Sequence, residues 1–112
     1  MVQQEHRRAK RFELRLPIEL VRSGSEELNK TTETRNVSSA GVLFFSESRL
    51  PVGEPIEYLI TLPTGPREAP RVRLHCVGTV IRLEASNRRN SREKPFQVAA
   101  TLERYEFVRV KS

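Results

Sequence analysis

A run of basic residues near the start of the chain is the first feature whose side chains could bind a ligand. Residues 6–11 read His-Arg-Arg-Ala-Lys-Arg and lie just before an alternating apolar pattern. An arginine can donate two hydrogen bonds to the O6 and N7 acceptors of guanine, fork onto a phosphate, or stack on a base. Arg7, Arg8 and Arg11 could therefore share the recognition of an anionic, planar ligand. On composition alone, a solvated basic tail is the commoner interpretation.

A second candidate site is the segment Asn36-Val37-Ser38-Ser39-Ala40-Gly41, which falls between two apolar stretches. Asn36 and Ser38 are two residues apart, so in an extended chain their side chains point to the same side. Gly41 allows a close approach of the backbone to a ligand. Taken alone, the segment also fits an ordinary turn, because turns use Asn, Ser and Gly.

The rest of the sequence offers no catalytic or metal-binding arrangement. The histidines, His6 and His75, lie far apart, and Cys76 is the only cysteine, so no spacing suits metal ligands or an internal disulfide. There is neither a nucleophile elbow nor a glycine-rich phosphate loop. We therefore expect a binding protein and not an enzyme, with no catalytic residue, no metal and no cofactor.

The charge of the chain agrees with an anionic ligand. The formal net charge is +6, and 16 of the 20 basic residues are arginines. The guanidinium group matches phosphates and base edges better than an ammonium does. Charge alone is also compatible with a solvated basic surface.

The elements that must position these residues are β-strands. Alternating apolar residues predict strands, and the predicted ranges are 12–20, 33–37, 42–45, 55–62, 71–83 and 96–102. The polar segment from Ser23 to Thr32 contains Gly24 and predicts a turn or loop. Proline-rich and arginine-rich segments at 63–70 and 85–95 predict further loops. Residues 103–111 could extend the last strand or form a short C-terminal helix.

About six short strands without a helical period predict an all-β fold, and closure removes the edges of such a small sheet. We expect a six-stranded, mainly antiparallel β-barrel. Residues 1–10 carry no core pattern and are predicted to be a flexible basic arm, with residues 11–112 as a single domain. No stretch is apolar enough to span a bilayer and no secretory signal is visible, so a cytoplasmic location is the expectation.

The basic run and the Asn-Ser-Gly segment, in this order and at this spacing, resemble the two motifs of PilZ domains. The family carries RxxxR at the start of the domain and [D/N]xSxxG some tens of residues later. Here residues 7–11 fit the first motif and residues 36–41 fit the second. The strand-like flanks agree, including a late stretch, Val77-Gly78-Thr79-Val80-Ile81-Arg82, that is similar to a GxVxR-like strand of the family. The resemblance covers nearly the whole chain.

The resemblance implies that the chain binds the bacterial second messenger cyclic di-GMP on the outer barrel surface. Arg7 and Arg11 would contact guanine edges and phosphates, and Arg8 would add a phosphate or stacking contact. Asn36 and Ser38 would hydrogen-bond the guanine base, and Gly41 would hold the turn. These six residues form the predicted ligand site.

Two further arginines are weaker candidates for the same site. Arg11 to Arg15 also reads RxxxR, and in that register Arg15 replaces Arg7. We prefer Arg7 and Arg11 because Arg15 is predicted to lie inside a regular strand. Arg82 is an additional candidate from the late strand. Asn36 stands where Asp is commoner in the family, which removes a carboxylate that could accept from guanine.

The resemblance also implies a switch, in which ligand orders the arm and a partner protein reads the result in trans. Two other functions remain open. One is a PilZ-like protein-interaction module that needs no ligand. The other is a small nucleic-acid-binding barrel, but such barrels stack bases on exposed aromatics. Most aromatics here fall on alternating core positions, with Phe45 and Tyr105 as exceptions, so the sequence argues against nucleic acid.

Overall fold

A computed structural model describes residues 13–62, 71–85 and 94–110. Seven β-strands are present in these ranges, and no helix is. In chain order the strands are β1 (Pro17–Ser23), β2 (Glu26–Val37), β3 (Gly41–Ser46), β4 (Pro55–Leu62), β5 (Arg71–Ala85), β6 (Phe96–Thr101) and β7 (Arg104–Val110). The arm at residues 1–10, with Arg7 and Arg8, lies outside the described residues, and so does Arg11.

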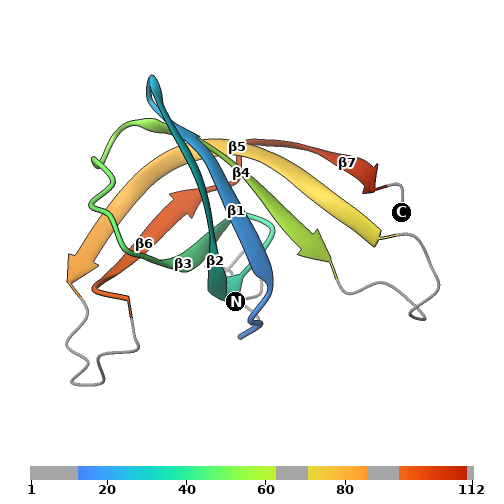
Figure 1. The fold of residues 1–112 in the computed structure, drawn as a ribbon, viewed down its shortest axis with the longest axis horizontal. Coiled ribbons are helices and arrows are strands. Elements are labelled where there is room, and N and C mark those ends of the chain that lie inside the picture. Colours follow the sequence, from blue (N-terminus) through green and yellow to red (C-terminus); the bar gives the residue numbers. More distant parts are fainter. Residues whose placement is uncertain (1–12, 63–70, 86–93, 111–112) are drawn as a thin grey trace, which may run out of the picture.

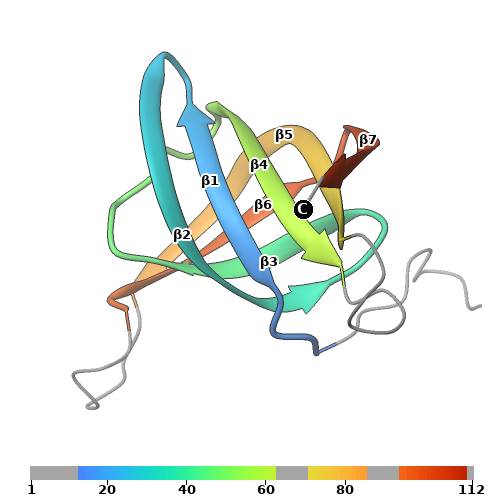
Figure 2. The same ribbon diagram turned by 45° about the vertical axis from the view of Figure 1, so that its right-hand side comes forward.

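Six of the strands form a closed antiparallel barrel. The hydrogen-bonded order is β4-β1-β2-β3-β6-β5, and β4 also pairs with β5, which closes the ring. The long strand β5 curves across the width of the molecule (Figure 1), so that its first half pairs with β4 and its second half with β6. β7 pairs with β5 on the outside of this ring (Figure 2). The predicted six-stranded barrel is confirmed, and β7 is an addition to it.

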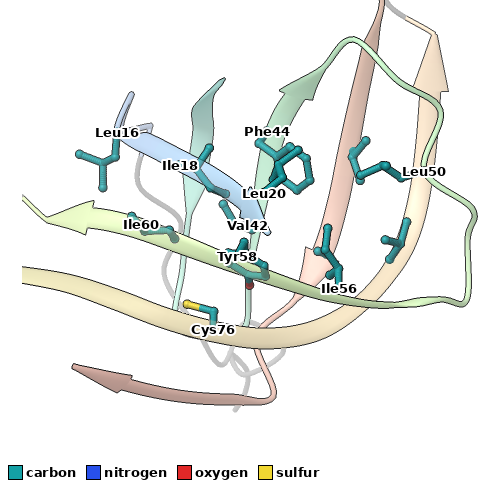
Figure 3. Close-up of a cluster of buried hydrophobic side chains, with 13 residues drawn as sticks. Leu16, Ile18, Leu20, Val42, Phe44, Leu50, Ile56, Tyr58, Ile60 and Cys76 are labelled. Atoms are coloured by element: carbon teal, nitrogen blue, oxygen red, sulfur yellow. The ribbon is translucent and has the colours of Figure 1, made fainter. Parts of the chain in front are cut away.

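The core fills the barrel interior with buried apolar side chains from β1, β3, β4, β5 and β6 (Figure 3). From β2, the partly buried Leu28 and Val37 pack against this cluster. Ile18, Phe44 and Tyr58 are among its fully buried members. The Tyr58 hydroxyl donates a hydrogen bond to the carbonyl oxygen of Thr101 at 3.0 Å. Burial raises the pKa of this phenol well above its usual value, so the group keeps its proton and remains a donor.

The first strand begins later than its apolar alternation predicted. It starts at Pro17, and Leu16, Ile18 and Leu20 point into the core, but Leu14 is 41 % exposed. Phe12 lies outside the described residues. The pairing of the strand with β2 shifts register between Leu20 and Arg22. Proline fits at the start of a strand because it has no N–H to contribute to the ladder.

The loop predicted from Ser23 to Thr32 was wrong. β1 and β2 form a hairpin whose turn is short, with Gly24 at φ 60°, and β2 already begins at Glu26. The apolar signal of residues 26–32 is weak because most of their side chains are exposed and only Leu28 among them packs against the core. In the predicted part of β2, a threonine takes a core position. The fully buried Thr34 hydroxyl accepts a hydrogen bond from the Leu16 N–H at 2.9 Å and donates one to the Leu14 carbonyl oxygen. A polar side chain satisfied in this way can replace an apolar one in the core.

The remaining strand predictions agree closely with the structure. The range 55–62 is confirmed as β4, and 71–83 lies within β5. At Gly78 the backbone of β5 lies close to the backbone of β6, because a Cβ atom there would collide with the Thr101 carbonyl oxygen. The bulge in β5 lies further on, between Val80 and Arg82. Residues 104–110 form β7, so the C-terminal helix that the sequence left open is not formed.

Candidate ligand-binding surface

The motif residues 36–41 form the end of β2, the turn and the start of β3. The Ser38 N–H donates to the Gly41 carbonyl oxygen at 2.9 Å, which closes the turn. The Ser38 hydroxyl accepts the N–H groups of Ala40 at 3.1 Å and Gly41 at 3.2 Å. Side-chain bonds of this kind stabilise turns. In this structure the Ser38 hydroxyl therefore holds the turn together, and its predicted contact with a guanine stays a prediction.

Gly41 is required by packing between two strands. A Cβ atom at this position would collide with the Ala100 carbonyl oxygen on β6. The same region is fixed by a hydrogen bond from the Leu102 N–H to the Ala40 carbonyl oxygen at 2.9 Å. The motif glycine therefore brings the turn against the end of β6.

Substitution of Ser38 by alanine is expected to lower the free energy of unfolding by about 1 kcal/mol, the usual net value of a hydrogen bond. Two backbone N–H groups of the turn would lose their acceptor. Urea denaturation measures the effect, and Ser39→Ala, at an exposed position of the same turn, serves as the control. Equal stability of the two variants would show that the Ser38 hydroxyl does not hold the turn.

Asn36 and Arg82, two predicted site residues far apart in sequence, lie in one row across four strands. Asn36 on β2 is opposite Leu43 on β3, Leu43 is opposite Ala99 on β6, and Ala99 is opposite Arg82 on β5. Directly opposite residues point to the same face of a sheet. The rows on either side contain buried core residues such as Phe44 and Val80, so this row faces outward.

The row forms a shallow platform with a polar group at each end. Neighbouring strands are about 4.8 Å apart, so Asn36 and Arg82 stand roughly 14 Å from each other. Leu43 and Ala99, both half-buried, lie between them. A flat base or nucleotide could rest on these two apolar side chains while the ends of the row bind its polar edges.

Arg35 joins this surface although the sequence reasoning did not select it. The pairing of β2 with β3 shifts between Thr34 and Asn36, which leaves Arg35 as the extra residue of a bulge. Its guanidinium donates a hydrogen bond to the side-chain oxygen of Gln97 on β6 at 3.1 Å. The only signal in the sequence is its place directly before Asn36, because a bulge cannot be recognised from residue types here.

Arg15 also reaches the outer surface, from the segment before β1. Its guanidinium lies 3.3 Å from the Glu33 carboxylate and 5.4 Å from the centre of the Phe45 ring. The premise that Arg15 lies inside a regular strand was wrong, because β1 begins at Pro17. Its position in the chain therefore no longer argues against the Arg11–Arg15 register. Arg15, Arg35 and Arg82, together with Asn36, are called the arginine surface below.

The ion pairs of the arginine surface are exposed. The Arg82 Nε lies 3.4 Å from the Glu84 carboxylate, and more than half of each side chain is accessible. The Arg15 pair with Glu33 is similarly open. Exposed pairs of this kind contribute little stability. A phosphate could therefore compete with either carboxylate at small cost.

Two other sequence predictions concern the exposure of aromatic side chains and the arginine-rich loop at 85–95. Phe45 was expected to be an exposed aromatic, but it is 6 % exposed and lies beneath Arg15. Tyr105 is 59 % exposed, as expected, and Phe107, which the sequence reasoning missed, is 67 % exposed. Among the basic residues of the loop predicted at 85–95, only Lys94 is described, and its ammonium group lies 3.2 Å from the Glu47 carboxylate.

A pocket of about 280 Å³ opens beside the first half of β2 and is separate from the motif turn. Leu20, Thr32, Phe45 and Lys94 are among the residues that line it. Neither Asn36 nor Arg82 does. The candidate ligand surface is therefore the open platform and not this pocket.

Comparison with known families decides the identity of the domain. The family model described as "PilZ domain" matches residues 5–106. The chain belongs to the PilZ family. PilZ domains are binding and adaptor domains of cyclic di-GMP signalling, and the match spans both motifs and all six strands of the barrel. No curated protein and no solved structure matches the chain.

The PilZ domain described by the structure contains no helix of the length and hydropathy that a membrane span requires. This finding covers residues 13–62, 71–85 and 94–110.

Proposed function

We propose that this PilZ domain binds cyclic di-GMP on the arginine surface, next to the motif turn. The observation that carries the proposal is the row from Asn36 to Arg82. It brings a motif residue and a distant arginine to the two ends of one outward-facing platform. Membership in a family of cyclic di-GMP receptors supports the choice of ligand.

The chemistry of the ligand suits this surface. Each guanine offers the O6 and N7 acceptors, which an arginine can bind with two hydrogen bonds. The Asn36 amide can both donate to and accept from a base edge. The phosphates would be bound by guanidinium groups through charge-assisted hydrogen bonds. The apolar centre of the row would contact the face of a base.

Arg7, Arg8 and Arg11 complete the proposed site from the N-terminal arm. In the bound state these arginines would lie over the ligand and bind the guanine edges and phosphates that the barrel does not reach. Fixing the arm costs conformational entropy, which the charge-assisted bonds must exceed. An arm fixed in this way would present a new surface to a partner protein in trans. The function is binding without catalysis or a cofactor.

The location of the ligand is tested with Asn36→Ala and Arg82→Ala in calorimetric titrations. Arg82→Ala is expected to weaken binding about 10- to 100-fold, since a hydrogen bond to a charged group contributes about 1.5–3 kcal/mol and 1.4 kcal/mol corresponds to tenfold. Asn36→Ala is expected to weaken binding by about 2- to 10-fold, since a hydrogen bond between neutral groups contributes about 0.5–1.5 kcal/mol. Arg73→Ala is the matched control. Arg73 is on the same strand as Arg82 but pairs with Glu19 on β1, away from the row.

Binding that Arg73→Ala weakens as much as Arg82→Ala would point to general charge attraction and would contradict the proposed location. Unchanged binding in both row variants would place the ligand elsewhere on the domain.

A further inference from the structure

β7 lies outside the closed barrel and pairs with β5 along its whole length. The pairing runs without a register shift from Arg71 opposite Val110 to Val77 opposite Arg104. In the described part of the chain, no strand pairs with the other edge of β7. That edge presents backbone N–H and C=O groups that another strand can bind.

Two rows of core residues continue from the barrel onto β7. Tyr58 and Cys76 are followed across the sheet by Tyr105, and Ile60 and Leu74 are followed by Phe107. The barrel members of these rows are buried or half-buried, whereas Tyr105 is 59 % and Phe107 67 % exposed. Their rings meet edge to face at 6.1 Å between centres. The core face of the sheet therefore ends in two large exposed aromatic side chains.

The edge of β7 lacks two of the features that usually keep edge strands apart. Natural edges are protected by proline, by a bulge or by charged side chains, lysine above all. The sequence Arg-Tyr-Glu-Phe-Val-Arg-Val contains neither proline nor lysine, and the pairing with β5 is regular. Three charged residues remain, Arg104, Glu106 and Arg109, so the strand can pair only in a register that keeps like charges apart.

We propose that β7 pairs with β7 of a second copy of this chain, antiparallel about a twofold axis at Phe107. In this register all seven residues of β7 pair. Phe107 lies opposite its own copy, and Tyr105 lies on the diagonal, within reach of the same ring. The two three-stranded units β4-β5-β7 join into one continuous sheet. This proposal does not rest on cyclic di-GMP binding.

The charges along β7 favour this register. Arg104 lies opposite Val110 of the copy and Glu106 lies opposite Val108, so no like charges face each other. A shift of the axis to Glu106 would place two carboxylates directly opposite, which is destabilising. The strand is therefore complementary to itself in the register that uses its full length, as a twofold interface requires.

A second apolar surface fits this face better than a nucleic acid does. Proteins that bind single strands combine aromatic side chains with a basic groove. Here the residues that share the face with Tyr105 and Phe107 on the two neighbouring strands are Tyr58, Cys76, Ile60 and Leu74. One basic residue, Arg109 opposite Val72, falls on the same face at the end of β7. The centre of the face is thus apolar across three strands, and a single arginine does not make a basic groove.

Sedimentation of the purified full chain over a range of concentrations tests the proposal. The unchanged chain is expected to form dimers at high concentration, and Phe107→Glu is expected to weaken the association at least 100-fold. Val52→Glu is the matched control, because Val52 is a similarly exposed apolar residue, 58 % accessible, in the turn between β3 and β4. Circular dichroism establishes that both variants are folded. A chain that stays monomeric at every concentration, or a Phe107→Glu variant that dimerises as the parent does, overturns the proposal.

The register is tested by disulfide formation under mild oxidation. Directly opposite Cα atoms are about 4.5–5.5 Å apart in an antiparallel pair, within the range that a disulfide spans. Phe107→Cys should cross-link to its copy, and Glu106→Cys, which faces Val108, should not. Cys76 does not interfere because it is fully buried, and burial raises the pKa of its thiol to about 12. Cross-linking of Glu106→Cys in place of Phe107→Cys would contradict the axis at Phe107.

Discussion

Alanine at position 41 is expected to lower the free energy of unfolding by about 1–3 kcal/mol, the usual cost of overpacking. The added Cβ atom would collide with the Ala100 carbonyl oxygen, which belongs to the backbone of β6. A backbone atom cannot move aside as a flexible side chain can, so β3 and β6 would have to separate locally. Their pairing runs from Gly41 opposite Thr101 to Ser46 opposite Phe96, and separation would weaken its first pairs.

Urea denaturation of Gly41→Ala measures this loss, with Ala40→Ser as the control at the neighbouring exposed position. The control should be as stable as the parent. If Gly41→Ala keeps the stability of the parent and loses only ligand binding, the glycine serves the ligand and not the packing of the barrel. The packing explanation of the motif glycine would then be wrong.

Substitution of both Arg7 and Arg11 by alanine is expected to weaken cyclic di-GMP binding more than 100-fold. The variant loses two charge-assisted contacts, and each such contact contributes about 1.5–3 kcal/mol to the binding free energy. Residues 1–10 carry no apolar core pattern, so the melting temperature of the free domain should stay within about 1 °C of the parent. Calorimetry gives the affinity and a thermal melt gives the stability.

Lys10→Ala is the control for the arm, because it removes a cation from the same segment and keeps both motif arginines, Arg7 and Arg11. A loss in Lys10→Ala equal to that of the double variant would indicate attraction by charge alone. Comparison of the single variants Arg7→Ala and Arg15→Ala resolves the register, because Arg15 belongs to the arginine surface in either case. If Arg7→Ala leaves binding unchanged and Arg15→Ala weakens it, the motif is Arg11 to Arg15.

The sequence predicts strands best where apolar residues alternate without interruption. β4 was predicted at its observed bounds because Ile56, Tyr58 and Ile60 alternate with outward-facing residues between two prolines. The first part of β2, residues 26–32, was missed because most of its side chains are exposed and the hairpin turn is only two residues long. The predicted part, residues 33–37, contains Thr34 at a core position.

The candidate site was predictable only in part. The motif turn at residues 36–41 was placed correctly between two strands, and Asn36 and Arg82 were both selected. Their position in one row depends on bulges at Arg35 and near Ile81, which set the register of β2 and β5. The alternation of apolar residues does not indicate where the register of a strand pair shifts. The platform and the position of Arg35 on it are therefore seen only in the structure.

The exposure of Tyr105 was expected from the sequence, but the exposed aromatic pair that it forms with Phe107 was not. Tyr105 and Phe107 lie on the same side of the strand as core residues of β5, and their alternation is that of a buried strand. They are exposed because β7 lies outside the ring that closes between β4 and β5. The closure of the ring is a property of the topology, which the alternation of one strand does not determine.

The most direct test of the central claim is calorimetric titration of the unmodified domain with cyclic di-GMP, with GTP and linear di-GMP as controls. We predict saturable binding of the cyclic ligand and at least tenfold weaker binding of both controls. An absence of heat and of any thermal shift at saturating cyclic di-GMP would contradict the receptor function and would leave the domain as a protein-interaction module.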